Sequence, residues 1–510
     1  MNIRFSLSIL FFSLVLMVNA QSPTPSFISD SLDNYINTGM ADWHIPGLAI
    51  AIIKDGKTIV MRGYGVKDLT TKEPVDENTL FQIASNSKLF TGTALAQLDY
   101  NKKLSIDDKV SKYIKDYSLY DKNSTDLVTI RDLLSHRIGT KTFQADFVFW
   151  NSNLSREGIM KRMKLMKPVA QFRQHYGYCN SCFMTAGEVI PIVSGKPWEV
   201  YVYDSILMPL QMNNTYTLSQ GINQRANVAK PYTNSYTGNL TELPFDNIDN
   251  IGAAASIVSN VKDISHWLQM QLDSGRYMGK QVMPWEVLEK TRVINNITRS
   301  SRHPYLPLHI QGYGLGVFTA DYLGRQIYFH TGGADGFVTN TCFVPEENLA
   351  ITILTNNDNQ NFFEALRYQV LDAYLGTSYR NHSKNFLPAF EKGQSETIKA
   401  TKAFRARVTG KSSNYSLDTY PGTYENEIYG EIEIEKNKEG KGLQINFPGH
   451  NNLTATLQYM DSEEWLLTYN NLSYGLFPVH FKMNNKKAIS IDIKVNDFID
   501  YDTYTFLKKG

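Results

Sequence analysis

The sequence is poor in cysteine and has no excess of charge of one sign. Its 510 residues include 3 cysteines, and 51 Lys and Arg stand against 50 Asp and Glu, for a formal net charge of +1. A nucleic-acid-binding protein normally shows a basic excess or stripe that neutralises phosphates. We therefore expect no nucleic-acid partner. Three cysteines are also too few, and odd in number, for a disulfide framework.

Long apolar runs are equally scarce, and the one near the start of the chain is short. Ile9–Val18 is almost unbroken and ends at small residues of the kind that a signal peptidase reads, Val18-Asn19-Ala20. A membrane helix needs about 20 apolar residues. We predict a signal peptide over residues 1–20, a soluble mature chain from Gln21 and a periplasmic or secreted location. An uncleaved anchor is the alternative, and no later segment is apolar enough to span a membrane.

Several catalytic and cofactor motifs are missing. There is no Gly-x-Ser-x-Gly elbow, which argues against an α/β-hydrolase. A phosphate-binding glycine-rich loop and a His-Glu-x-x-His helix are absent too. Cys179 and Cys182 have redox-motif spacing, but they lack a thioredoxin-like context and further zinc ligands. We interpret them as small, partly buried residues, leave open whether they pair, and expect neither metal nor cofactor.

The apolar pattern predicts an α/β (α+β) fold with two main parts. Ile45–Gly65 is typical of a hairpin with an Asp-Gly turn, and a helical pattern follows Ser85. The stretch from about 129 to 210 is mostly helical. Strands then return, and we predict them at Tyr313–Thr319, Arg325–Phe329, Phe337–Val344 and Leu349–Leu354. Strands at both ends with helices between them indicate one antiparallel sheet flanked by helices, with a helical subdomain.

The pattern changes beyond about residue 376. A polar stretch leads to a charged, helix-like segment near Glu396–Arg407, and short alternating strands follow. We predict them at Gly430–Glu435, Leu443–Phe447, Thr454–Tyr459, Trp465–Tyr469, Ile489–Val495 and Thr503–Leu507. Such spacing is typical of a small sandwich or barrel. The predicted domains are therefore 21–376, a linker with a charged helix over 377–412, and an all-β domain over 413–510.

The most informative stretch for chemistry begins at Phe81 and contains Ser85-Asn-Ser-Lys88. A serine hydroxyl is a weak nucleophile until a base removes its proton. Helix positions i and i+3 share a face, which places Lys88 beside Ser85. Burial or a neighbouring cation would lower the pKa of the lysine enough for it to act as that base. Ser-x-x-Lys alone is weak, because it recurs at Ser259–Lys262, which we interpret as an ordinary helix start.

Taken together, a set of motifs resembles the penicillin-binding-protein and class C β-lactamase superfamily of serine hydrolases. In that family a Phe-x-Ile-Ala-Ser-x-Ser/Thr-Lys block precedes Tyr-x-Asn, matched here by Tyr178-Cys-Asn180, and then a Lys/His-Thr-Gly strand, matched by His330-Thr331-Gly332-Gly333. Family-like neighbours accompany these motifs at Leu133–His136, Pro209–Thr215, Gly252–Ser256 and Tyr313–Gly316. The resemblance covers about residues 45–376.

The resemblance implies a role for each matching residue. Ser85 would attack the substrate carbonyl, and Lys88 and Tyr178 would share the proton transfers, the tyrosine as a phenolate beside the ammonium or the lysine as base. Asn180 would orient the substrate amide or the lysine. Backbone amides of Ser85 and Gly333 would form an oxyanion hole. His330 and Thr331 would line the strand edge that holds an extended substrate, and Gly332 belongs to the same implied substrate-binding and oxyanion segment.

Two departures from the family pattern bear on the substrate. Typical class C β-lactamases carry Lys where this chain has His330, and a histidine is mostly neutral at pH 7. Arg137-Ile138 also stands where relatives more often have Thr-Ser, which predicts a reshaped loop. Both features argue against β-lactamase activity, and the His-Thr-Gly variant resembles D,D-peptidases and esterases of the superfamily.

The expected function is hydrolysis of a peptide, amide or ester through an acyl-serine intermediate, possible substrates including D-amino-acid-containing peptidoglycan fragments. The alternatives are a class C-like β-lactamase or an esterase and, in another class, a penicillin-binding sensor that acylates without turnover. The tail resembles the lipocalin-like barrel fused to some such hydrolases, on Tyr420–Tyr424 and Tyr429-Gly430. It would be a stabilising module or, as a third alternative, a carrier. The sequence specifies no oligomeric state.

Overall fold

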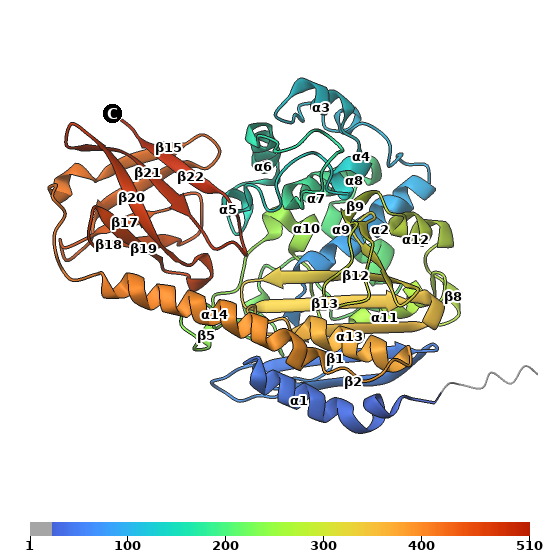
Figure 1. Ribbon diagram of the computed structural model, residues 1–510. Helices are drawn as coiled ribbons and strands as arrows, with labels where there is room; N and C mark the ends of the chain where they lie inside the picture. The colour runs from blue at the N-terminus through green and yellow to red at the C-terminus, as the bar shows by residue number, and fades with distance from the viewer. Residues whose placement is uncertain (1–22) are drawn as a thin grey trace, which may run out of the picture.

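The computed structural model describes residues 23–510, so the predicted signal peptide lies outside the described residues. The described chain forms a mixed α/β part built on one large antiparallel sheet, with a closed β-barrel beside it (Figure 1). This confirms the predicted fold class, an antiparallel sheet flanked by helices and followed by a small all-β barrel.

The large sheet has eight strands in the order β2-β1-β14-β13-β12-β11-β10-β9, and every neighbouring pair is antiparallel. Its strands are β1 (Gly47–Lys54), β2 (Lys57–Gly65), β9 (Asn296–Arg299), β10 (Gln311–Tyr313), β11 (Phe318–Tyr322), β12 (Arg325–Ala334), β13 (Phe337–Val344) and β14 (Leu349–Thr355). The pairing of β1 with β14 joins the first hairpin to the late strands. Residues about 300 positions apart in sequence thus share one sheet.

Local sequence explains two of the tight turns of this sheet. Asp55 and Gly56, between β1 and β2, have φ of 51° and 73°, the left-handed values that an Asp-Gly hairpin turn uses. Asn348, before β14, has φ of 46°. Strands β13 and β14 are buried along their whole length because helices cover both faces of the sheet. That double burial explains their nearly continuous apolar sequence.

The helices of the described residues lie on both faces of the sheet and in the helical region above it (Figure 1). They are α1 (Leu32–Asp42), α2 (Ser87–Tyr100), α3 (Lys122–Leu127), α4 (Ile130–Leu134), α5 (Asp146–Phe149), α6 (Arg156–Arg162), α7 (Asn180–Gly187), α8 (Val189–Ser194), α9 (Trp198–Val202), α10 (Gly252–Ala255), α11 (Val261–Leu272), α12 (Trp285–Arg292), α13 (Phe362–Tyr374) and α14 (His382–Ala406). The second Ser-x-x-Lys match lies at the start of α11, where Asn260 caps the helix. It is an ordinary helix start.

The predicted strand Tyr313–Thr319 is wrong, because the chain leaves the sheet between β10 and β11. Gly316 there has φ of 95°, a conformation that glycine adopts without a steric penalty. A Cβ on Gly316 would lie 2.3 Å from the backbone oxygen of Lys88. Gly316 therefore lets this loop pack directly on helix α2, and Gly314 lets it approach the backbone oxygen of Thr291 in helix α12.

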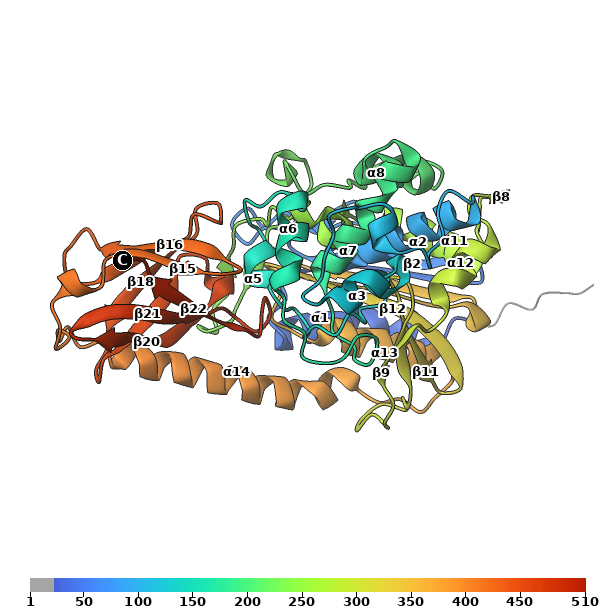
Figure 2. The same ribbon diagram turned by 90° about the horizontal axis from the view of Figure 1, so that it is seen from above.

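Helix α14 is longer than the charged segment predicted near Glu396–Arg407, and it runs from the sheet to the barrel (Figures 1 and 2). Its first turns pack on the α/β part. Trp43 Nε1 donates to Ser383 Oγ at 2.9 Å, and the Trp43 and Phe390 ring centroids are 4.9 Å apart. The charge pattern predicts only the second half of helix α14. The first half is stabilised by tertiary contacts, which the local sequence does not show.

The barrel closes because its first strand pairs with its last, Tyr424 opposite Lys508. Its strands are β15 (Gly422–Asn426), β16 (Gly430–Lys436), β17 (Leu443–Asn446), β18 (Thr454–Tyr459), β19 (Glu464–Tyr469), β20 (Leu476–Asn484), β21 (Lys487–Lys494) and β22 (Thr503–Lys508). The sequence pattern missed β15 and β20. A glycine begins β15 and Pro478 lies inside β20, and both residue types weaken a strand prediction.

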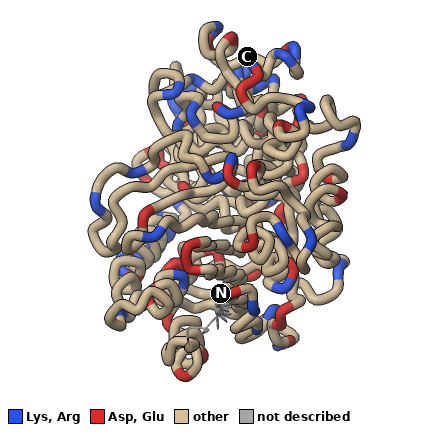
Figure 3. The backbone as a smooth tube through the Cα atoms, turned by 90° about the vertical axis from the view of Figure 1, so that its right-hand side faces the viewer, with Lys and Arg blue, Asp and Glu red and all other residues tan. Residues whose placement is uncertain are grey.

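Charges of both signs are interspersed over the face shown in Figure 3. This agrees with the formal net charge of +1. That face therefore offers no single-sign field that would attract a polyanion.

Among the helices of residues 23–510, none combines the length and the apolar character needed to cross a bilayer.

Candidate active site

Ser85 lies in the middle of a sharp turn that leads from strand β3 (Phe81–Gln82) into helix α2. Residues Ala84–Asn86 form a 3₁₀ turn, so Ser85 precedes the α-helix by two residues instead of beginning it. Ala84 has φ of 45°, a strained value for a residue with a Cβ. The turn is nevertheless helical enough to bring Lys88 Nζ within 3.1 Å of Ser85 Oγ.

Lys88 is fully buried and has three oxygen neighbours. Its Nζ lies 3.1 Å from Ser85 Oγ, 2.6 Å from Asn180 Oδ1 and 2.9 Å from the backbone oxygen of Ala254. Burial lowers the pKa of Lys88 to about 7, against the opposing effects of Asp146 and the Cys179 thiol. A neutral amine has two N–H donors and one lone pair. If Asn180 and Ala254 accept the two donors, the lone pair is left for the Ser85 hydroxyl.

Tyr178 lies in the segment just before helix α7 and faces the same serine. The Lys88 Nζ atom is 4.6 Å from the centre of its ring, a cation–π distance when the lysine is protonated. Burial raises the pKa of Tyr178, while the Ser85 hydroxyl acts in the opposite direction. The phenol oxygen is buried, and no hydrogen bond of ordinary geometry reaches it. The pocket therefore favours a neutral phenol over the phenolate that the family resemblance implied as one possibility.

The Tyr178–Asn180 segment is held by a histidine and a cysteine. Cys179 N donates to His136 Nδ1 at 3.0 Å, and the His136 ring is 4.3 Å from the Tyr178 ring. Cys179 Sγ accepts from Cys182 N at 3.3 Å and thereby caps helix α7. Both cysteines are buried and free, as expected for small core residues. His136 and the cysteines therefore position the tyrosine motif.

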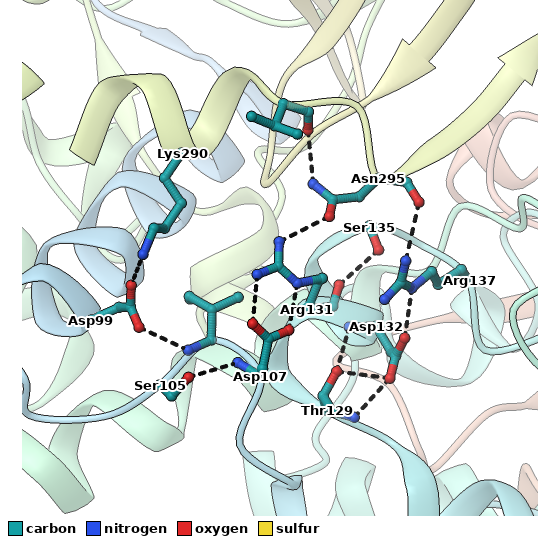
Figure 4. Close-up of polar contacts among 12 residues, drawn as sticks. Asp99, Ser105, Asp107, Thr129, Arg131, Asp132, Ser135, Arg137, Lys290 and Asn295 are labelled. Atoms are coloured by element: carbon teal, nitrogen blue, oxygen red, sulfur yellow. Dashed lines mark hydrogen bonds and ion pairs between the residues drawn. The ribbon is translucent and has the colours of Figure 1, made fainter. Parts of the chain in front are cut away.

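A polar network shown in Figure 4 anchors the loop that carries His136. Asp132 is fully buried and accepts from Arg137 Nε at 2.6 Å and from Arg173 Nη2 at 2.7 Å. Arg137 also donates to the backbone oxygen of Asn295 at 3.2 Å. Arg137, the arginine that departs from the family pattern, thus supports the loop from within through Asp132 and Asn295.

The strand β12 carries the other predicted residues. His330 is buried, its Nε2 lies 2.9 Å from Tyr313 Oη and its Nδ1 lies 2.8 Å from the backbone oxygen of Thr331. Burial and the neighbouring Lys88 lower the pKa of His330 to about 3. His330 is therefore neutral at physiological pH and supplies no cation for a substrate carboxylate.

The glycines after Thr331 allow two close approaches. A Cβ on Gly332 would lie 2.0 Å from the backbone oxygen of Ile83, so β12 packs directly on the turn before Ser85. A Cβ on Gly333 would lie 2.7 Å from Phe498 Cζ, a ring that comes from the barrel. Gly333 and Ser85 both line one cavity.

That cavity has a volume of about 670 Å³ and is lined by residues of the α/β part, of helix α14 and of the barrel. The predicted residues in its wall are Ser85, Tyr178, Asn180, His330, Thr331 and Gly333. Aromatic side chains form much of the remaining lining: Phe143, Trp150, Tyr176, Phe318, Phe363, Phe390, Phe498 and Tyr501. Lys88 and Gly332 lie just behind the wall. Among the described residues that line the cavity, none is Lys or Arg.

Sequence reasoning missed the barrel's share of this cavity. Phe498, Ile499 and Tyr501 belong to the segment between β21 and β22, about 400 residues after Ser85. It also missed Asp146, which lines the cavity from helix α5. No local signal marks these residues, because only the packing of the barrel and of α5 brings them to the site.

Among the described residues, no group of three or more His, Cys, Asp or Glu could hold a metal ion.

The sheet, the helical region and the serine–lysine pair facing a cavity define the β-lactamase and penicillin-binding type of serine hydrolase fold. The model of the Beta-lactamase family matches residues 32–375, and the chain belongs to this family. This confirms the resemblance inferred from the motifs.

Sequence identity to individual relatives is low. The chain is 25% identical over 359 residues to Protein flp of Staphylococcus aureus, a match that covers 69% of this chain and 66% of that protein. It is 27% identical over 409 residues to the Unguisins hydrolase ungD' of Aspergillus campestris, covering 77% and 75% of the two chains. The octameric penicillin-binding protein homologue from Pyrococcus abyssi shares the fold, with a TM-score of 0.61, 22% identity and coverage of 94% and 100%.

Proposed function

We propose that this protein is a serine hydrolase in which Ser85 forms an acyl-enzyme and neutral Lys88 is the base. The position of the Lys88 amine carries the proposal. It lies 3.1 Å from Ser85 Oγ, is fully buried, and has a pKa lowered to about 7. A base whose pKa is close to the working pH combines a large deprotonated fraction with adequate basicity.

The proposed acylation step follows from these contacts. The Ser85 hydroxyl gives its proton to Lys88 Nζ as Oγ bonds to the substrate carbonyl carbon. Backbone N–H groups of Ser85 and Gly333 stabilise the resulting oxyanion. The leaving group departs with the proton of the Tyr178 hydroxyl, which the Lys88 ammonium replaces. Water then attacks the acyl ester as Lys88 takes one proton from it, and that proton passes to Ser85 Oγ as the ester C–O bond breaks and the acid is released.

The cavity supports an uncharged substrate with an apolar acyl group. Its wall is largely aromatic, no Lys or Arg lines it, and His330 is neutral. Two carboxyl groups, Asp146 and Asp358, line it instead. A penicillin or a peptide that ends in a free carboxylate would therefore bind without a cationic partner. We propose uncharged esters or amides, including blocked D-amino-acid peptides, in preference to β-lactams and D,D-carboxypeptidase substrates.

Intact-mass measurement tests the reaction itself. The full-length protein is incubated with a p-nitrophenyl ester of an apolar acid, and both product and protein mass are followed. We expect a transient acyl adduct on Ser85 and continuing product release, and Ser85→Ala should abolish both. Ser259→Ala, in the second Ser-x-x-Lys match, is the control. A stable adduct without product would support an acylating sensor instead.

Matched peptides test the substrate class. The same N-acylated D-aminoacyl peptide is supplied as the free acid and as the C-terminal amide. We expect the amide to be hydrolysed with a kcat/KM at least ~10-fold higher, because the acid has no cation to bind it. Preference for the acid, or rapid hydrolysis of a cephalosporin, would contradict the substrate proposal and leave the acyl-serine proposal intact.

We also infer export from the short apolar run near the N-terminus. The expectation is a mature protein that begins at Gln21 and is recovered outside the cytoplasm. N-terminal sequencing of the protein expressed with residues 1–20 tests it, and an intact N-terminus would contradict cleavage.

A further inference from the structure

Helix α5 lies between the catalytic region and the barrel in both views of the molecule (Figures 1 and 2). Its first residue, Asp146, is buried, and one carboxylate oxygen accepts from Asn180 Nδ2 at 2.6 Å. The other end of the same amide, Asn180 Oδ1, lies 2.6 Å from Lys88 Nζ. Asp146 is thus one residue removed from the base of the proposed reaction.

The chemistry of these three groups determines how the amide is oriented. An asparagine amide has one accepting end and one donating end. The Asp146 oxygen that faces Asn180 accepts a hydrogen bond from its NH₂ group, and this contact turns the amide oxygen of Asn180 towards Lys88. The opposite orientation would set N–H groups against N–H groups at Lys88 and a carbonyl oxygen against a carboxylate. Asp146 therefore selects the orientation in which Lys88 can use one N–H on Asn180.

The next residue of α5 is enclosed by the barrel. Phe147 is fully buried, and its ring centroid is 5.1 Å from Tyr429, 5.3 Å from His450 and 5.4 Å from Tyr504. Its backbone N–H donates to Asp500 Oδ2 at 3.1 Å. Asp500 lies in the segment between β21 and β22 and also accepts from Tyr504 Oη at 2.6 Å. The barrel thus contacts both the side chain and the backbone of Phe147.

On the basis of the proposed acyl-serine chemistry, we propose that Asp146 is a positioning residue that orients Asn180 towards Lys88, and that the barrel holds Asp146 in place by enclosing Phe147. The barrel then acts on catalysis through helix α5 in addition to lining the cavity.

The electrostatic surroundings predict a signature of this role. Asp146 raises the pKa of Lys88 against the effect of burial. The other titratable groups that interact with Lys88 or Asp146 are Cys179, Cys182, His136, His330, Tyr178, Tyr504 and Asp500. Burial and Asp500 raise the pKa of Asp146 itself. Removing the carboxylate should therefore lower the pKa of Lys88 and extend activity to lower pH.

Two substitutions at Asp146 separate charge from orientation. In Asp146→Asn the new amide oxygen still accepts from Asn180, so the alkaline plateau of kcat/KM should fall by less than ~10-fold. The acid limb of its pH profile should move down by roughly one pH unit. Asp146→Ala should show the same shift and lose about 100-fold at the plateau, because Asn180 is no longer oriented. An unmoved acid limb in both variants would overturn the proposal.

A double substitution tests the contribution of the barrel. Phe147→Ala should lower kcat/KM by at least ~10-fold in the wild-type background, and Phe147→Leu should restore most of the loss. In the Asp146→Ala background, Phe147→Ala should cost little more, because both act through one group. Arg162→Ala is the matched control: it removes a different contact with the barrel, a bond from Nε to the Ile428 oxygen at 3.0 Å. Fully additive losses for Phe147 and Asp146 would overturn the barrel's role.

A measurement that needs no turnover keeps the two proposals separate. The Lys88 side chain is titrated by NMR in the full-length protein with isotopically labelled lysine, its signal assigned by its loss in Lys88→Met. We expect the Lys88 pKa to be lower in Asp146→Asn than in the wild type, and equal values would overturn the inference. If the wild-type protein forms no acyl-enzyme, the proposed function fails, and this titration still decides whether Asp146 acts on Lys88.

Discussion

The α/β part and the barrel line the same cavity, but they contribute to it in different ways. The α/β part supplies groups suited to chemistry, above all the Ser85–Lys88 pair and the Tyr178 phenol. The barrel supplies largely apolar surface, including Phe498, Ile499 and Tyr501. Under the proposed function, this difference predicts a division of work, with bond making in the α/β part and substrate affinity and support in the barrel.

Lys88→Met should have the largest effect and tests the chemical side of this division. It removes the base while keeping an apolar side chain of similar length, so kcat/KM should fall by at least ~1,000-fold. The free energy of unfolding at pH 7 should not fall, because burial lowers the pKa of Lys88 to about 7 and folding then releases a proton that the unfolded chain binds; methionine removes this cost. Steady-state kinetics and thermal melting check both expectations.

Lys262→Met is the control for that substitution. Lys262 occupies the same place in the second Ser-x-x-Lys match but is exposed on helix α11. Its kinetics should equal those of the wild type. Comparable losses in the two variants would show that the activity does not depend on the Lys88 site.

Two neighbouring glycines distinguish a contact within the α/β part from a contact with the barrel. The added Cβ of Gly332→Ala meets the backbone oxygen of Ile83 at 2.0 Å and would displace the turn before Ser85. We expect a loss of about 100-fold in kcat/KM. Gly333→Ala meets only the Phe498 ring at 2.7 Å, so a loss of about 10-fold or less is expected.

The Phe498→Ala background sharpens this comparison. There Gly333→Ala should cost nothing further, because the ring that it displaces is gone. Gly332→Ala should remain as harmful as before. Kinetics of the single and double variants measure the coupling, and a Gly333→Ala loss that persists without the ring would contradict the contact with the barrel.

Phe498→Ala by itself tests the barrel's contribution to affinity. The side chain is 39% exposed at the wall of the cavity. Its removal should raise KM for apolar-acyl substrates by about 10-fold and leave kcat nearly unchanged. Leu507→Ala, an exposed residue elsewhere on the barrel, is the control. A fall in kcat with an unchanged KM would show that the barrel acts on the chemical step through Phe498.

Asp358→Asn should have the smallest effect and concerns stability. Burial raises the pKa of the Asp358 carboxyl from 3.8 to about 7. The stability that its protonated form contributes is complete below about pH 4 and is lost as the pH rises through 7. The asparagine variant lacks this loss. Its Tm should exceed that of the wild type by roughly 2 °C at pH 8, with a smaller difference at pH 5. Equal differences at both pH values would contradict the pKa assignment.

The sequence predicted those parts of the fold whose signals are local. The hairpin of β1 and β2 follows from its Asp-Gly turn, and β13 and β14 follow from their apolar runs. The break at Gly314-Leu-Gly316 and strand β20 with its Pro478 were not predicted. The break is fixed by the contact of Gly316 with helix α2, and β20 forms in spite of its proline because it pairs with β19 and β21 on either side.

The sequence by itself determined that Ser85 and Lys88 share a face, because one helical turn separates them. It also determined the family, through several motifs in a defined order. Only the tertiary structure decided that Lys88 is buried enough to be a base, that Tyr178 and His330 are neutral, and that Asp146 and the barrel's aromatic residues reach the cavity. Burial and long-range proximity depend on how the whole chain packs, and no short segment encodes them.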